Sequence, residues 1–103
     1  EQYQEAIMYY QEVLALNEKL PDIHVEIGVC YFNLNDFNMA EKKFKEAVEL
    51  SPQHTKALFN LGVVYFNMNH RDKAVESWKN LINVAPQSME AQRAKSFLER
   101  MEI

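Results

Sequence analysis

Apolar residues recur along most of the chain at intervals of three and four, the spacing that places side chains on one face of an α-helix. Two adjacent runs of this kind consist of Ile27, Tyr31 and Leu34 and of Ala40, Phe44, Ala47 and Val48. Asn35 separates these runs, and asparagine tolerates the left-handed conformation that closes a helix. Pro52 breaks the chain after the second run. The pattern predicts helices over residues 3–17, 21–34, 37–50, 56–68, 71–84 and 88–101, with Thr55 and Ser88 as N-caps.

The sequence also repeats itself with a period of 34 residues. Residues 21–54 align with residues 55–88 without a gap and share ten identities, where chance gives about two. The identical pairs are Gly28/Gly62, Val29/Val63, Tyr31/Tyr65, Phe32/Phe66, Asn33/Asn67, Asn35/Asn69, Ala40/Ala74, Lys45/Lys79, Pro52/Pro86 and Gln53/Gln87. Residues 3–17 match the second half of a preceding unit, and residues 89–102 match the first half of a following one.

A helix–turn–helix unit of 34 residues with this punctuation resembles the tetratricopeptide repeat (TPR). The residues that carry the resemblance are Ile27, Gly28, Tyr31, Ala40, Phe44, Ala47 and Pro52, and then Leu61, Gly62, Tyr65, Ala74, Trp78 and Pro86. The resemblance implies an all-α fold, a right-handed superhelix (α-solenoid) of antiparallel helix pairs in a single domain over residues 1–103. Its parts are a half unit (3–17), two repeats (21–54 and 55–88) and a capping helix (89–102), with Gly28 expected to face Ala40 and Gly62 to face Ala74.

Composition and charge exclude several kinds of partner. The formal net charge is −4, and the basic residues are interspersed with acidic ones, so no nucleic-acid partner is expected. No apolar run approaches the ~20 residues of a membrane-spanning helix, so no membrane insertion is expected. The single cysteine, Cys30, lies in an apolar stretch and is predicted to be a small buried hydrophobe. The chain begins without a methionine and is expected to be a piece of something longer, so a cytoplasmic location is only a default.

The motifs that catalysis or metal binding requires are missing from the sequence. It contains no phosphate-binding glycine loop, nucleophile elbow or calcium loop. The three histidines, His24, His54 and His70, lack the spacing of metal ligands and are predicted to be surface or packing residues. The sequence therefore predicts a protein that is not an enzyme and has neither a cofactor nor a metal.

The resemblance also implies a concave wall, lined by the first helix of each pair, where TPR proteins bind their ligands. The residues of this chain at those places are Val25, Val29, Phe32, Asn33, Lys56, Phe59, Asn60, Val63, Phe66, Asn67, Arg93, Phe97 and Arg100. This wall is apolar and edged by Asn and Arg, which is typical of an interaction site. The leading hypothesis is a scaffold that binds a peptide or helical segment of another protein. Phe59 is expected to be exposed for the ligand, whereas Phe32 and Phe66 are either ligand contacts or scaffold.

Two other hypotheses remain open, and a third is set aside. The chain could self-assemble through its groove or its N-terminal helix, whose apolar stripe includes Tyr3, Ile7, Tyr10 and Leu14. It could also be a regulatory segment of a larger enzyme. A chaperone-tail adaptor is not expected, because the TPR subtype that grips a terminal carboxylate uses a set of Lys, Asn and Arg residues. Lys56 and Asn60 could imitate single members of that set, but the remaining places are Val25, Glu26 and Val29, which cannot hold a carboxylate.

Overall fold

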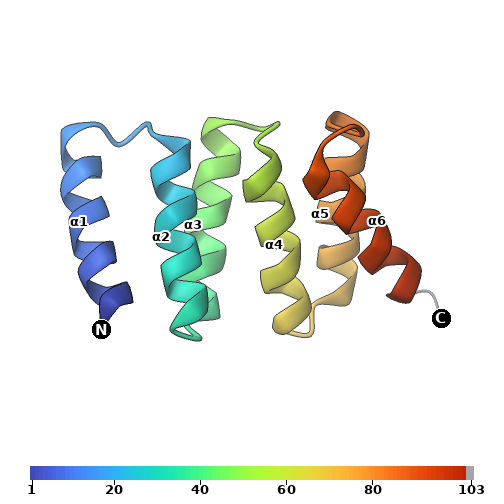
Figure 1. Ribbon diagram of the computed structural model, residues 1–103, viewed down its shortest axis with the longest axis horizontal. Helices are drawn as coiled ribbons and strands as arrows, with labels where there is room; N and C mark the ends of the chain where they lie inside the picture. Colours follow the sequence, from blue (N-terminus) through green and yellow to red (C-terminus); the bar gives the residue numbers. More distant parts are fainter. Residues whose placement is uncertain (102–103) are drawn as a thin grey trace. The chain divides into compact units, whose positions relative to one another are not determined.

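The computed structural model describes residues 1–101, and this part of the chain contains six α-helices and no strand (Figure 1). The helices are α1 (Gln2–Leu16), α2 (Pro21–Asn33), α3 (Phe37–Leu50), α4 (Thr55–Asn67), α5 (Arg71–Val84) and α6 (Met89–Met101). Each end lies within one residue of its predicted position, which confirms the all-α helical-repeat fold. The domain and repeat boundaries stay predictions, and residue 102, the predicted end of the capping helix, lies outside the described residues.

Asparagine closes the first helix of each pair, as the sequence predicts. Asn35 has φ 63° and Asn69 has φ 65°, both in the left-handed region. The Asp36 N–H donates to the Tyr31 carbonyl at 2.9 Å, and the same bond recurs 34 residues later at 2.8 Å. These bonds satisfy helix carbonyls that would otherwise lack a partner, so each turn ends α2 or α4 and starts the next helix.

The sequence predicts two N-caps, and the structure confirms one of them. The Ser88 hydroxyl accepts from the Ala91 N–H at 3.0 Å, as predicted. Thr55 was the wrong choice, because it is the first residue of α4 and His54 is the cap. The His54 Nδ1 accepts from the Ala57 N–H at 3.2 Å. An imidazole nitrogen that carries no proton serves here as the acceptor that a hydroxyl usually supplies.

The chain folds as two compact units, the first covering residues 1–52 and the second beginning at Gln53. In the first unit α2 packs against α3, and α1 packs against α2. Ile7, Ile27 and Cys30 form the core between α1 and α2. His24 of α2 is buried as well, and its Nε2 lies 3.0 Å from the Glu18 carbonyl, which ties α2 to the segment before it.

The second unit consists of α4, α5 and α6, each of which contacts the other two. Its largest buried side chain is Trp78 of α5, which is 2% exposed. The Trp78 Nε1–H donates to the Phe59 carbonyl of α4 at 3.2 Å. The indole is thereby both packed and fixed in orientation, because its single polar group has a buried partner.

The two repeat glycines make room for an aromatic ring of the second helix in each pair. A Cβ atom on Gly28 would lie 2.5 Å from Phe44 Cε1, and one on Gly62 would lie 2.6 Å from Trp78 Cδ1. Ala40 and Ala74 are fully buried, but they are not the nearest neighbours of the glycines. The ring on the second helix of each pair is therefore the nearest neighbour of the glycine, and the pairing with alanine stays a prediction.

Candidate functional site

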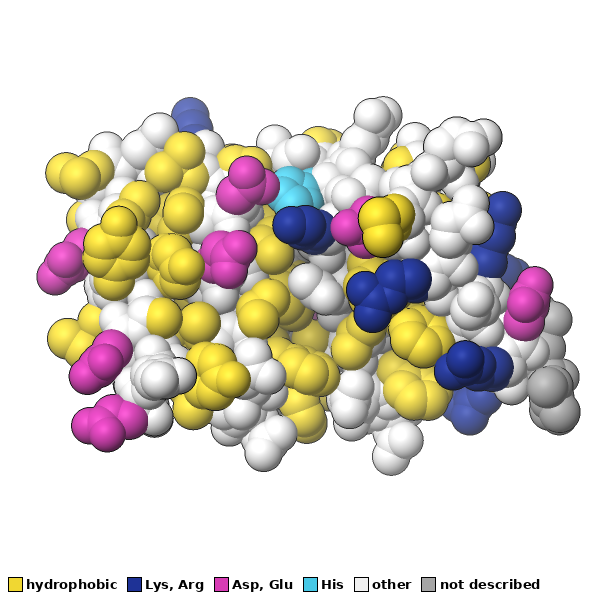
Figure 2. Space-filling model, in the orientation of Figure 1, with side chains coloured by type: hydrophobic (Ala, Val, Ile, Leu, Met, Phe, Trp, Pro, Cys, Tyr) yellow, Lys and Arg dark blue, Asp and Glu magenta, His cyan; other side chains and the backbone are white. Residues whose placement is uncertain are grey.

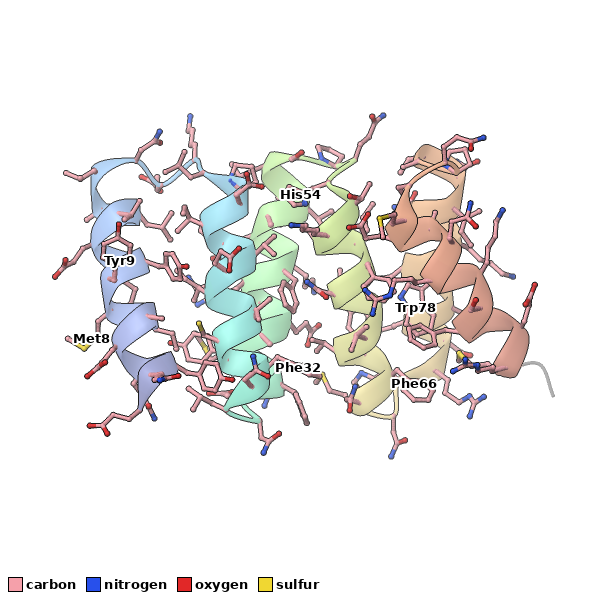
Figure 3. The ribbon with its side chains drawn as sticks, viewed as in Figure 1. Met8, Tyr9, Phe32, His54, Phe66 and Trp78 are labelled. Atoms are coloured by element: carbon pink, nitrogen blue, oxygen red, sulfur yellow. The ribbon has the colours of Figure 1, made fainter. Side chains whose placement is uncertain are left out.

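An apolar pocket of about 330 Å³ opens on the second unit. Its walls come from all three helices of that unit, and Figure 3 labels two of the lining residues, Phe66 and Trp78. The lining residues are Val63, Phe66, Asn67, Trp78, Phe97, Arg100 and Met101. Five of them, Val63, Phe66, Asn67, Phe97 and Arg100, belong to the predicted binding residues.

Helical spacing explains how the pocket is assembled. On α4, Val63 is followed by Phe66 and Asn67 at the third and fourth positions, so the three side chains share one face. On α6, Phe97 is followed in the same way by Arg100 and Met101. Two short helix faces therefore oppose each other, and both belong to helices that pack directly together.

Aromatic side chains form the back of the pocket. The ring centroids of Trp78 and Phe97 lie 5.4 Å apart, and those of Trp78 and Phe66 lie 6.4 Å apart. Phe59 stacks on Phe97 with centroids 5.9 Å apart. Aromatic pairs at these distances stabilise one another beyond the area they bury. The pocket is therefore lined by a rigid cluster, with Phe66 as its exposed member at 44%.

Two arginines of α6 lie on the aromatic cluster. The Arg93 guanidinium is 5.0 Å from the centre of the Phe59 ring, and the Arg100 guanidinium is 5.9 Å from the centre of Phe97. No ion pair of either arginine occurs among residues 1–101. Figure 2 shows basic side chains bordering an apolar patch over α4 and α6. The pocket thus combines an apolar floor with positive charge at its edge.

Three other predicted residues of the second unit, Lys56, Phe59 and Asn60, do not line the pocket. Phe59 is only 7% exposed, so the expectation of an exposed anchor was wrong. Its ring is covered by Phe97 and by the Arg93 guanidinium. Lys56 is exposed and Asn60 is half-buried, and neither lines the pocket. The predicted residues of α4 that do line the pocket are therefore those near its C-terminal end, Val63, Phe66 and Asn67.

The predicted residues of the first unit do not form an equivalent site. Val25 is 4% exposed and belongs to the core, which contradicts its assignment as a ligand contact. Val29 and Phe32 are half-buried, and the Phe32 ring lies 5.3 Å from the ring of Phe37. Residue 71, the counterpart of Phe37, is an arginine. Phe66 therefore lacks the aromatic cover that its counterpart Phe32 has.

The two predicted asparagines use their amides locally. The Asn33 Nδ2 donates to the Val29 carbonyl at 3.0 Å, and the Asn67 Nδ2 donates to the Val63 carbonyl at 2.8 Å. Both side chains are exposed, and Asn67 lines the pocket. Each amide still offers its carbonyl oxygen, so Asn67 can accept one hydrogen bond at the pocket wall.

Two lining residues, Trp78 and Met101, were absent from the sequence prediction. Trp78 occupies the core position of Phe44, so the repeat alone assigns it to the interior. The larger indole reaches from that interior to the pocket. The sequence feature that could have indicated the pocket is the change from Phe37 to Arg71. This change removes the aromatic ring that would cover this end of the unit.

The N-terminal helix exposes a different face from the one predicted. Ile7 is 6% exposed, and Tyr10 and Leu14 pack with it against α2, so the stripe proposed for self-assembly is covered. Among the predicted residues only Tyr3, at 40%, is exposed. The most exposed apolar side chains of α1 are Met8, Tyr9 and Leu16, at 64%, 63% and 89%. Figure 3 shows Met8 pointing away from α2.

Other candidate chemistry is limited in the described part of the chain. Burial raises the pKa of the Cys30 thiol, and the nearby Glu26 carboxylate raises it further, so the thiol stays protonated and the predicted packing role is confirmed. Within residues 1–101 there is no group of three or more side chains suited to hold a metal ion. None of the six helices has the length and apolar character needed to cross a membrane.

Comparison with known proteins gives a family and a fold. Residues 1–101 match the family described as the cilia and flagella-associated protein 70 middle TPR-like domain. RNA polymerase-associated protein CTR9 of Saccharomyces cerevisiae is 38% identical over 56 residues, which span 53% of this chain and 5% of the yeast protein.

Solved structures of the same fold include two TPR proteins. YrrB, described as a TPR protein with an unusual peptide-binding site, is 32% identical with a TM-score of 0.82, over 92% of this chain and about half (49%) of its own. The first TPR of Spaghetti (RPAP3), bound to the HSP90 peptide SRMEEVD, is 23% identical with a TM-score of 0.85, over 99% of this chain and 82% of its own. The chain belongs to the middle TPR-like domain family of cilia and flagella-associated protein 70, and its helix pairs are tetratricopeptide repeats.

Proposed function

We propose that this chain is a protein-interaction scaffold and that the pocket of its second unit receives an apolar side chain of a partner peptide. The observation that carries the proposal is the position of Phe66. Its ring is 44% exposed, yet it packs against the buried Trp78 and lines a preformed cavity. An exposed aromatic ring on a rigid apolar floor gains free energy when a ligand covers it.

The size and lining of the pocket indicate what it can hold. At about 330 Å³ it lies at the lower end of the range for small-ligand sites, which suits one or two side chains. Only two of its lining residues, Asn67 and Arg100, have side chains that are mainly polar. Such a site recognises an apolar anchor by shape and orients the rest of the peptide through its edge.

The relatives support binding as the general role. YrrB is described as having a peptide-binding site, and the Spaghetti domain carries a peptide from HSP90. Proteins of this family and fold typically serve as scaffolds and not as enzymes. These comparisons support a peptide as the kind of ligand, while the pocket of the second unit is a proposal from the geometry of this chain.

The test is an NMR titration of the whole chain with two uncharged peptides. One is acetyl-Gly-Ser-Asn-Phe-Asn-Ser-Gly-amide, and the control has Ala in place of Phe. The amide signals of Val63, Phe66 and Phe97 should shift with the Phe peptide and not with the Ala peptide. Equal shifts with both peptides, or shifts confined to residues 1–52, would contradict the proposal.

The outer face of α1 favours a second function, self-association. Met8, Tyr9 and Leu16 are largely exposed, and water-exposed apolar groups gain free energy when a second surface covers them. Sedimentation equilibrium at rising concentration should show a dimer that Met8→Glu abolishes, with Gln11→Glu as the exposed control on the same helix. A wild-type chain that stays monomeric at all concentrations would rule this function out.

A further inference from the structure

We infer that the partner segment carries acidic side chains near its apolar anchor, and that Arg93 and Arg100 receive their carboxylates. This inference rests on the proposed function, since it describes the ligand of the same pocket. It concerns side-chain carboxylates within a segment and not a carboxylate at the end of a chain.

Charge is distributed unequally along the sequence. Residues 1–52 contain four Lys or Arg and ten Asp or Glu, a formal charge of −6. Residues 53–103 contain seven and five, a formal charge of +2, and all three arginines, Arg71, Arg93 and Arg100, lie in this half. The unit that holds the apolar pocket is therefore also the basic unit, although the whole chain is acidic.

Both arginines at the pocket contact aromatic rings, and no carboxylate within residues 1–101 forms an ion pair with them. Contact with the ring limits the motion of the guanidinium. The N–H donors lie in the plane of the guanidinium itself and can face outward. A carboxylate fits this arrangement because it can accept two parallel hydrogen bonds from one guanidinium.

A third guanidinium supports the edge of the pocket. Arg71 of α5 donates from Nη2 to the main-chain carbonyl of Met101 at 3.3 Å, and Met101 lines the pocket. Arg71 is occupied by this carbonyl and fixes the end of α6. Its positive charge adds to the field at the pocket without being the primary contact.

The spacing of Arg93 and Arg100 suits a segment with one acidic residue two positions before its anchor and another two positions after it. Arg93 and Arg100 are seven residues apart on α6, or about 10 Å along the helix axis. Phe97 lies between them and lines the pocket. Side chains of an extended peptide alternate between its two faces, so the residues that share the anchor's face lie two positions before and after it, about 13 Å apart. The long arginine side chains can close the remaining distance, so both carboxylates and the anchor can be held together.

The experiment compares two amidated peptides that differ only in charge. Acetyl-Gly-Asp-Ser-Phe-Ser-Asp-Gly-amide is titrated against its counterpart with Asn in place of both Asp, using the whole chain. We expect the Asp peptide to bind about three- to tenfold more tightly, because exposed ion pairs contribute modestly. Raising NaCl from about 0.05 to about 0.5 M should remove most of this difference and leave the Asn peptide unaffected.

Three variants of α6 assign the effect to the arginines. Arg93→Gln and Arg100→Gln should each weaken the Asp peptide about two- to threefold more than they weaken the Asn peptide. Lys95→Gln is the matched control, because it removes the same charge from an exposed position of the same helix that does not line the pocket. A loss of affinity of the same size for both peptides would mean that the arginines act only by packing, which overturns the inference.

The outcomes separate this inference from the proposed function. If both peptides bind equally and the arginine variants have no effect, the pocket binds apolar anchors without reading charge, and only the inference fails. If neither peptide binds, the proposed function fails with it. Tighter binding of a variant of the Asn peptide with a free C-terminal carboxylate than of the amidated Asp peptide would also overturn the inference, because the arginines would then prefer a chain end.

Discussion

Gly28 and Gly62 show how single residues decide the packing of each helix pair. Alanine normally stabilises a helix interior relative to glycine by about 0.5–1 kcal/mol. Here a Cβ on Gly62 would overlap Trp78, which is 2% exposed and fixed by its hydrogen bond to Phe59. The indole cannot move aside without breaking that bond or opening the core.

Gly62→Ala should therefore destabilise the fold by about 1–3 kcal/mol through overpacking. Urea unfolding followed by circular dichroism gives the change in free energy. Ser96→Ala is the control, because Ser96 occupies the same place of the repeat in α6 and is exposed. A Gly62→Ala protein as stable as the control would show that the ring has room to shift.

Cys30 should make stability fall at alkaline pH. Its pKa is raised by burial and then by Glu26, so the unfolded thiol ionises first. The unfolded state then binds fewer protons than the folded state, and stability decreases as pH rises above about 8.5, the ordinary thiol value. Cys30→Val, which introduces the residue found at position 64, should reduce this loss. Urea unfolding at about pH 7 and about pH 9.5 measures it. The same pH dependence in both proteins would exclude the thiol as its cause.

The sequence predicts the buried core positions well and the exposed, ligand-facing positions poorly. Ala40, Phe44 and Ala47 are buried as their spacing indicates. Phe59 and Val25 were assigned to a ligand surface but are buried, because the first helix of a pair packs on more than one neighbour. Helical periodicity identifies one apolar face, and it cannot tell a second buried face from an exposed one when both are apolar.

At the scale of the element, punctuation residues determine where the helices end. Asn35, Asn69, Pro52 and Pro86 set the boundaries, and the helices follow the prediction to within one residue. The orientation of α1 was less predictable. Both of its faces carry apolar side chains, and the choice between them depends on how α2 packs, which local sequence does not encode.

The left-handed turn at Asn69 allows a direct test of this punctuation. Asn69→Ala should destabilise the protein by about 1 kcal/mol, because a β-carbon without a compensating polar group disfavours φ near +65°. Asn69→Gly should be neutral or stabilising at the same position. Thermal unfolding of the two variants gives the comparison. If alanine were tolerated as well as glycine, the turn would not depend on backbone conformation.

At the scale of the whole molecule, the repeat supplies two similar units that have diverged in charge and in surface. The first is acidic and covers Phe32 with Phe37, whereas the second is basic and leaves Phe66 at a pocket. Aligning the two repeats with each other reveals the scaffold that they share. The functional differences lie at the positions where the residues of the two units differ. Those disagreements were visible in the sequence, but their meaning required the contacts of Arg71, Arg93 and Trp78.

The central claim is that the second unit, and not the first, holds the peptide-binding pocket. The most direct measurement is the affinity of the acidic Phe peptide for Phe66→Ala and for Phe32→Ala, the same change at equivalent places of the two units, in proteins with unchanged circular dichroism. Phe66→Ala should weaken binding about fivefold or more, as loss of a hot-spot residue does, and Phe32→Ala should change it by less than about twofold. Equal losses in both variants, or a larger loss from Phe32→Ala, would contradict the account.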